Sequence, residues 1–138
     1  MNRFVWPVRV YYEDTDSAGV VYYANYLKFM ERARTEWLRD LGYEQDVLAR
    51  EAKLQFVVRA VQLDYWRPAR FNDLLQVVSR ISVAKRASLI FAQTIARTRE
   101  PDVPLCSGLI RVACVHTESL KPQPLPRIPL LDEVFGDY

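Results

Sequence analysis

The sequence predicts an α+β fold, a five-stranded antiparallel sheet wrapped around one long helix, from two periodic patterns and their order along the chain. Apolar residues recur every three or four positions over about residues 25–41, which indicates one amphipathic helix. From Leu54 to residue 116 the apolar residues recur every second position, which indicates strands. A further strand-like stretch precedes the helix. An antiparallel sheet curled around the helix would bury the apolar faces of both.

The predicted helix, about residues 25–41, carries a wide apolar stripe. Asn25 is expected to cap its start, and Gly42 is expected to end it. Arg34 falls at the edge of the stripe, where a charge needs a partner, and either Glu31 or a backbone carbonyl is expected to provide one. The stripe itself consists of residues spaced as on one helix face, namely Tyr26, Met30, Ala33, Trp37 and Leu41.

The predicted strands are separated by breaks at residues 67–69, 84–86 and 99–102, which indicates antiparallel hairpins. The first strand is expected from Val5 to Tyr12, with Pro7 moving its start to an edge or a bulge. Four prolines occur in the nine residues that begin at Lys121. They predict that residues 121–138 form an irregular arm on a single domain of residues 1–138.

Composition limits the classes of partner. The chain has 138 residues, half of them apolar, and a net charge of +2 with dispersed basic residues, which argues for one globular domain and against nucleic acid. Cys106, Cys114 and the single His116 are poorly spaced for a tetrahedral metal, so free buried thiols are expected, with no metal and no cofactor. A secretory signal and an apolar run of about 18 residues are absent from the sequence, so a cytoplasmic protein is expected.

The stretch EDTDSAGVVYYANY, from Glu13 to Tyr26, joins the first strand to the helix. Helix N-termini present unpaired N–H groups that stabilise an anionic oxygen. If Asp16 folds back toward that end, a carboxylate and an oxyanion hole would face one acyl carbon, as acyl transfer or hydrolysis requires. Two alternatives stay open. Asp16 could serve as a turn or capping residue, and Tyr22, Tyr23 and Tyr26 could line an acyl pocket or belong to the core.

Residues 10–26, VYYEDTDSAGVVYYANY, followed by FMERARTEWL at 29–38, resemble the signature of hot-dog-fold acyl-CoA thioesterases. The closest resemblance is to the Tol-Pal-associated (YbgC-type) enzymes, with the 4-hydroxybenzoyl-CoA thioesterases next. It extends more loosely through RPARFND at 67–73 and covers most of residues 8–117. The resemblance implies a hot-dog fold and an enzyme that hydrolyses an acyl- or aroyl-CoA to the free acid and coenzyme A.

The resemblance also implies roles for individual residues of the opening stretch. Asp16 takes the position of the catalytic aspartate, as nucleophile or as general base on a water, and the backbone N–H of Tyr23 is the oxyanion donor. Tyr23 is also a departure, because the Tol-Pal-associated enzymes usually carry His there. The substrate-binding positions that it implies in this stretch are Gly19, Val20, Tyr22 and Tyr26.

Another branch of hot-dog thioesterases uses a glutamate on the helix, which makes Glu31 the rival carboxylate. Glu31 lies six residues after Asn25. That spacing places it about 9 Å along the axis from the helix entry, so it is assigned to structure.

Partners follow from the same resemblance. Lys85 and Arg86 form the basic turn expected to meet the phosphates of coenzyme A from a neighbouring subunit, with Arg67 and Arg70 as weaker candidates. A homotetramer is expected, built from dimers whose sheets join edge to edge, and an acyl carrier protein is a candidate partner. The alternative function is a non-catalytic acyl-CoA or acyl-carrier-protein binding adaptor linked to the cell envelope.

Overall fold

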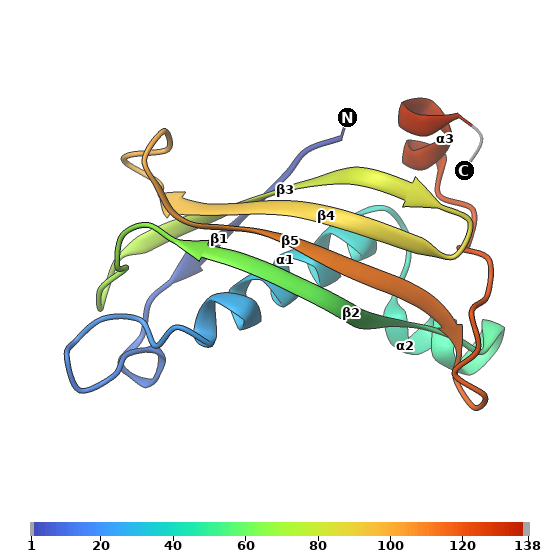
Figure 1. The fold of residues 1–138 in the computed structure, drawn as a ribbon, viewed down its shortest axis with the longest axis horizontal. Helices are drawn as coiled ribbons and strands as arrows, with labels where there is room; N and C mark the ends of the chain where they lie inside the picture. Colours follow the sequence, from blue (N-terminus) through green and yellow to red (C-terminus); the bar gives the residue numbers. More distant parts are fainter. Residues whose placement is uncertain (1, 137–138) are drawn as a thin grey trace.

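The computed structural model describes residues 2–136 and contains one five-stranded antiparallel sheet with the strand order β1-β3-β4-β5-β2 (Figure 1). The predicted α+β class and the five antiparallel strands are confirmed. The four later strands lie between the predicted breaks because charged and turn-forming residues interrupt the alternating pattern there. The strands are β1 (Phe4–Arg9), β2 (Leu54–Tyr65), β3 (Leu74–Lys85), β4 (Ser88–Arg97) and β5 (Pro104–His116).

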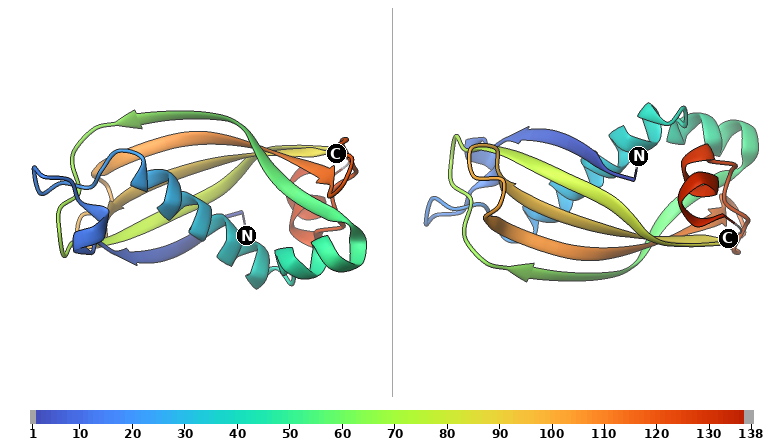
Figure 2. Two further views of the ribbon diagram at one scale, coloured as in Figure 1. Left: turned by 90° about the horizontal axis from the view of Figure 1, so that it is seen from below. Right: turned by 90° about the horizontal axis from the view of Figure 1, so that it is seen from above.

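Helix α1 (Asn25–Asp40) has 16 residues and lies across one face of the sheet (Figure 2). It ends where the sequence predicts, because Gly42 follows with a φ of 96°, a left-handed conformation that favours glycine. Its buried face includes five hydrophobic side chains with 3% exposure or less, Tyr26, Phe29, Met30, Ala33 and Trp37.

The predicted cap of α1 is wrong. Ala24 occupies the N-cap position and makes no side-chain cap, whereas Asn25 is already the first helical residue. The Asn25 side-chain amide donates instead to the carbonyl of Asp14 at 2.8 Å. Asn25 therefore ties the preceding loop to the helix start.

The first strand is shorter than predicted. β1 ends at Arg9, and Tyr12–Asp14 form a 3-10 turn, η1. The Asp14 carboxylate accepts a hydrogen bond from the Tyr11 N–H at 2.8 Å, which favours a turn over continued strand. Pro7 lies in an edge strand, as expected of a residue without a ladder N–H.

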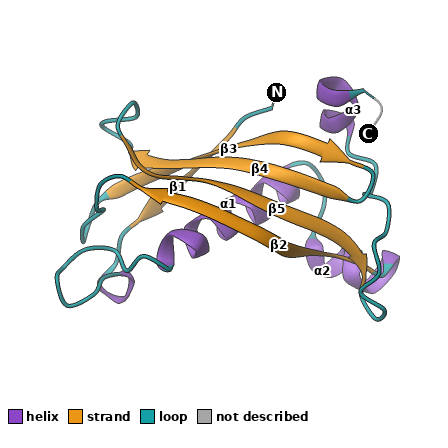
Figure 3. Cartoon of the chain, viewed as in Figure 1, coloured by secondary structure: helices purple, strands orange, loops and turns teal. Residues whose placement is uncertain are grey.

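The C-terminal arm is less irregular than predicted. Residues Pro129–Phe135 form a helix, α3, so that prediction is wrong for this part of the arm (Figure 3). Pro129 occupies the first turn, where its missing N–H costs nothing, and Leu130 and Leu131 are buried. The arm is also attached to the sheet, because the Leu125 N–H donates to the Arg86 carbonyl at 2.8 Å. Residues 137–138 of the predicted arm lie outside the described residues.

Two short helical turns follow α1 and were not predicted. They are α2 (Gln45–Val47) and a π-helical turn, η2 (Leu48–Ala52). Lys53, with a φ of 57°, ends this segment and leads into β2. Among the described residues 2–136, no helix is long and apolar enough to cross a membrane.

A buried polar network links α1 to the sheet. The Arg34 guanidinium donates to Oε1 of Gln93 at 2.9 Å, and Nε2 of Gln93 donates to the Met30 carbonyl at 3.0 Å and to the Ser79 hydroxyl at 2.9 Å. The predicted need of Arg34 for a partner is confirmed, but the hydrogen-bond partner is the Gln93 side chain, and the predicted partners, Glu31 or a backbone carbonyl, are wrong. Gln93 is 1% exposed, so these bonds form away from water.

The two cysteines lie on β5 as free, buried thiols, which confirms that prediction. Burial, with a smaller contribution from Asp64, raises the pKa of Cys106 to about 12. The Cys106 thiol is therefore protonated at neutral pH and is a poor nucleophile.

Gly108 in β5 is packed against β2, and a methyl group there is expected to destabilise the sheet. A Cβ at Gly108 would lie 2.2 Å from Cδ2 of Leu63 and 2.9 Å from the Gln62 carbonyl oxygen. Because the second of these atoms is backbone, we expect Gly108→Ala to lower the free energy of unfolding by about 1–3 kcal/mol, measured by urea titration. The adjacent Leu109→Ala truncates a half-exposed side chain and should stay within about 0.5 kcal/mol. Equal midpoints for both variants would contradict the prediction.

Candidate active site

The segment before α1 folds as a small hairpin. Thr15 and Val21 form an antiparallel bridge, and Val20 pairs with Arg70 of the loop that precedes β3. The Gly19 N–H donates to the Asp16 carbonyl at 3.0 Å and closes the tip. Gly19 has a φ of 78°, so its lack of a side chain suits this turn.

Asp16 lies at the exposed tip of this hairpin. Its Oδ1 accepts a hydrogen bond from the Ala18 N–H at 2.9 Å, which is the turn-stabilising role that the sequence left open. The Asp16 N–H pairs with the carbonyl of Val20 at 2.9 Å. Val20 is three residues, or about 10 Å of extended chain, before Tyr23.

The entry of α1 presents two backbone amides that have no acceptor among the described residues. The Tyr22 N–H donates to the Asp14 carbonyl, and the Asn25 N–H donates to the Tyr22 carbonyl. Between them, the N–H groups of Tyr23 and Ala24 donate to no acceptor within residues 2–136. Such free amides at a helix start carry partial positive charge and can bind an anionic oxygen.

A shallow pocket of about 260 Å³ borders this entry. Tyr23 and Tyr26 line it, so the structure brings these two predicted residues together. Asp16, Gly19, Val20 and Tyr22 are not among its lining residues. Four further lining residues were not predicted for an acyl pocket, namely Val21, Tyr65, Trp66 and Pro68. Arg67 also lines the pocket, although the sequence suggested it only as a weak candidate for binding phosphate.

The sequence contained a signal for this second wall. The aromatic pair Tyr65 and Trp66 stands directly before the break at Arg67, and both side chains are about half exposed, at 47% and 58%. Large aromatic side chains left exposed at the end of a strand often mark a binding surface. The alternating pattern predicted the strand but did not predict that the exposed aromatic residues at its end line a pocket.

Hydrogen bonds and one ion pair connect the segments that line the pocket. The Ala69 N–H donates to the Tyr26 hydroxyl at 3.0 Å, and the Val21 N–H donates to the Ala69 carbonyl at 2.8 Å. Arg97 pairs with Asp73 at 2.9 Å and also donates to the carbonyl of Pro68. Burial raises the pKa of the Tyr26 hydroxyl, which therefore stays protonated.

Lys85 and Arg86 lie far from this pocket in the same chain. They form the turn between β3 and β4, at the opposite end of the sheet from the Asp16 hairpin (Figure 1). β3 has 12 residues from Leu74 to Lys85, so the two ends are roughly 36 Å apart. One chain does not bring the basic turn to the entry of α1.

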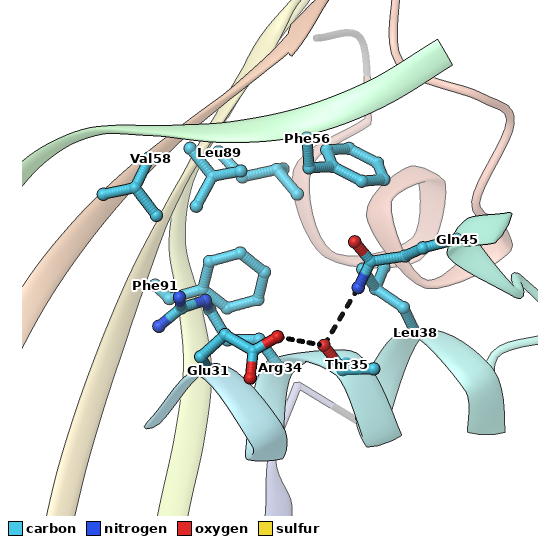
Figure 4. A pocket seen from close by; sticks show the side chains of 10 residues that line it. Glu31, Arg34, Thr35, Leu38, Gln45, Phe56, Val58, Leu89 and Phe91 are labelled. Atoms are coloured by element: carbon cyan, nitrogen blue, oxygen red, sulfur yellow. Dashed lines mark hydrogen bonds between the residues drawn. The ribbon is translucent and has the colours of Figure 1, made fainter. Parts of the chain in front are cut away.

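A second pocket, of about 100 Å³, opens between α1 and β2 (Figure 4). Glu31 faces it, and its carboxylate accepts a hydrogen bond from the Thr35 hydroxyl at 3.1 Å, which in turn accepts one from the Gln45 amide at 3.0 Å. Arg34 also lines this pocket, over the Phe91 ring. Glu31 is not among the residues that line the pocket at Tyr23, in agreement with its assignment to structure.

His116 takes part in a turn. Its Nδ1 accepts the N–H groups of Glu118 at 3.1 Å and Ser119 at 3.4 Å. His116 is the last residue of β5, at the end of the strand remote from the Asp16 hairpin, so it does not supply an imidazole to the entry of α1.

The chain belongs to the thioesterase-like superfamily, which matches residues 10–135. It is 45% identical over 126 residues to the acyl-CoA thioesterase YbgC of Haemophilus influenzae, a match that covers 91% of this chain and 90% of the relative. The acyl-CoA thioester hydrolase YbgC of Escherichia coli O157:H7 is 44% identical over 124 residues, 90% of each chain. The resemblance to thioesterases that the sequence indicated is confirmed.

Solved structures agree with this assignment. The crystal structure of a probable thioesterase from Bartonella henselae superposes with a TM-score of 0.84 at 37% identity, over 90% of this chain and 99% of that one. The fold described above is therefore that of a thioesterase-like domain.

Proposed function

We propose that the chain is an acyl-CoA thioesterase that hydrolyses the thioester of an acyl- or aroyl-CoA. The observation that carries this proposal is the N–H of Tyr23 at the start of α1, on the border of a pocket, which has no acceptor in the part of the chain that the structure describes. In the proposal α1 is the central helix of a hot-dog fold, and its first amides polarise the thioester carbonyl. The relatives named above, which are thioester hydrolases by name, support the substrate class.

In the proposed reaction the carbonyl oxygen of the substrate accepts the Tyr23 N–H, and the negative charge that develops on this oxygen is stabilised there. Asp16 either attacks the acyl carbon or removes a proton from a water that attacks it. In both routes the C–S bond breaks and the thiolate of coenzyme A takes a proton. Where Asp16 has attacked, a water then hydrolyses the anhydride between Asp16 and the acyl group, and the free acid leaves in either case. The pocket at Tyr23 and Tyr26 holds part of the substrate close to these groups.

The test is release of free thiol from a panel of coenzyme A thioesters with aroyl, short-chain and long-chain acyl groups. A rate well above the uncatalysed rate for at least one member is expected, and the best member defines the acyl preference. No release across the panel, with protein that is folded by circular dichroism, would overturn the proposal.

One observation favours a second candidate, a non-catalytic acyl-CoA or acyl-carrier-protein binding adaptor at the cell envelope. Asp16 is exposed, binds its own turn and is not among the residues that line the pocket. The same panel distinguishes the two functions. An adaptor would bind an acyl-CoA in a calorimetric titration and release no thiol.

We also propose that the enzyme acts as a homotetramer, a dimer of dimers joined through sheet edges. β2 is an edge strand, and it exposes Val58 by 49% and Val61 by 43%. A long apolar edge strand is normally covered by another chain. In such an assembly Lys85 and Arg86 of a neighbouring subunit could meet the phosphates of the substrate. An acyl carrier protein as donor and a cytoplasmic location stay predictions from the sequence.

A further inference from the structure

Tyr65, the last residue of β2, connects the edge of the sheet to the entry of α1. Its hydroxyl donates to the Tyr23 carbonyl oxygen at 2.9 Å, across 42 positions in the sequence. Its ring meets the rings of Tyr23 and Tyr26 edge-on, with centroids 6.4 and 5.5 Å away. The hydroxyl and the ring of Tyr65 thus make separate contacts with the residues at the entry of α1.

Tyr65 itself is held in place on both sides. It pairs with Cys106 of β5, and the next residue, Trp66, donates its N–H to the Leu105 carbonyl at 2.8 Å. Tyr26, against which it packs, is 3% exposed and holds Ala69 through its hydroxyl. The Tyr65 hydroxyl therefore projects from a fixed strand end.

Tyr23 lies between this contact and the helix start. The Tyr22 carbonyl, which shares a peptide group with the Tyr23 N–H, accepts the Asn25 N–H at 2.8 Å, and the Tyr22 and Tyr23 rings are 4.7 Å apart between centroids. The Tyr23 side chain is 62% exposed, and the Tyr23 N–H donates to no acceptor within the described residues 2–136. The carbonyl and the N–H of Tyr23 belong to adjacent peptide groups that share one α-carbon. The bond from Asn25 holds the peptide group that carries the N–H, and the bond from Tyr65 holds the peptide group on the other side, so the two bonds together restrict rotation at this α-carbon.

We propose that Tyr65 is a positioning residue for thioester hydrolysis, whose hydroxyl fixes the Tyr23–Ala24 peptide group and, together with the bond from Asn25, keeps the Tyr23 N–H directed at the substrate carbonyl oxygen. This inference rests on the proposed function. A donor set in place before the reaction stabilises the developing oxyanion without a reorganisation cost, and a small displacement of the donor lowers the rate steeply. Tyr65 acts through Tyr23 and is not assigned a contact with the reacting atoms.

The protonation state of Tyr65 fits this role. Partial burial, with smaller contributions from Cys106, Tyr23 and Tyr26, raises the pKa of the Tyr65 hydroxyl above its usual value near 10. The hydroxyl is therefore a donor at every pH at which a thioester assay is practical.

The test compares Tyr65→Phe with the wild type and with Tyr12→Phe in the full chain. Phenylalanine at 65 keeps the ring contacts and removes the hydroxyl. Tyr12 is a matched control, because its ring stacks on Phe71 and its hydroxyl binds no acceptor within residues 2–136. For the best thioester of the panel, Tyr65→Phe is expected to lower kcat about tenfold with KM unchanged, while Tyr12→Phe keeps both constants.

The readouts separate positioning from a structural role and from failure of the proposed function. Melting temperatures within about 2 °C of the wild type for both variants, together with the fall in kcat alone, would support the inference. An unchanged kcat in Tyr65→Phe would overturn it, and so would a parallel loss of kcat and of melting temperature. A wild type that is inactive on every thioester would overturn the proposed function itself.

Discussion

An Asp16→Asn variant is expected to lose between about a hundredfold and about 10⁴-fold in kcat for thioester hydrolysis, with an unchanged melting temperature. Asparagine cannot serve as a nucleophilic carboxylate or as a general base. It keeps an oxygen at the position of Oδ1, so the hydrogen bond from the Ala18 N–H and the turn at the hairpin tip are retained. The measurement is thiol release under saturating substrate, together with thermal unfolding at the same protein concentration.

The control for this prediction is Glu13→Gln, an exposed carboxylate of the same segment. It removes the same charge and should leave kcat within about twofold, because Glu13 is exposed and has no contact with the reacting atoms in the proposed mechanism. A kcat for Asp16→Asn close to that of Glu13→Gln would remove Asp16 from the mechanism. Asp16 would then only stabilise the turn at the tip of the hairpin, and this result would support the adaptor hypothesis.

A Gln93→Leu variant is expected to lose about 3 kcal/mol of unfolding free energy. Gln93 accepts from Arg34 and donates to the Met30 carbonyl and the Ser79 hydroxyl. Leucine would leave the Arg34 guanidinium buried without its acceptor. Burial lowers the pKa of Arg34 to about 10 even though the Glu31 carboxylate nearby acts in the opposite direction. The measurement is urea unfolding at fixed protein concentration.

The sign of the Arg34 contribution leads to a compensating variant. A base whose pKa is lowered on folding destabilises the fold at every pH below the lowered value, because its proton is bound more tightly in the unfolded chain. The double variant Gln93→Leu with Arg34→Met removes the charge as well, and should recover most of the lost stability. Gln62→Leu, at an exposed position of β2, should change stability by no more than about 0.5 kcal/mol. Equal losses in the single and the double variant would contradict this account.

The fold was predictable where one physical pattern dominates. The apolar stripe of α1 and the alternation of β3 and β4 both follow from burying one face of an element, and both predictions are confirmed. The errors lie where local hydrogen bonds or tertiary packing compete with the pattern. Asp14 turns the end of the first predicted strand into η1, and burial of Leu130 and Leu131 makes a helix from a segment rich in proline.

The site was predictable only in part. The pattern before α1 identified Tyr23 and Tyr26, which do lie together, because adjacency along the chain places them at one helix start. Tyr65 and Arg67 reach the same pocket from the end of β2, some 40 positions further on. Which strand ends beside the entry of α1 depends on the order of strands in the sheet, and the alternating pattern carries no information on that order.

Because the Asp16 hairpin and the Lys85–Arg86 turn lie at opposite ends of the sheet, mutations at the two ends are expected to complement each other in a mixed oligomer. If both ends serve one substrate molecule, each complete site draws its acid from one copy of the chain and its cations from another. Mixed oligomers of two variants, one substituted at Asp16 and the other at the Lys85–Arg86 turn, would then contain some sites in which both the acid and the cations are intact. Two inactive variants of the gene, expressed together, would therefore restore part of the activity.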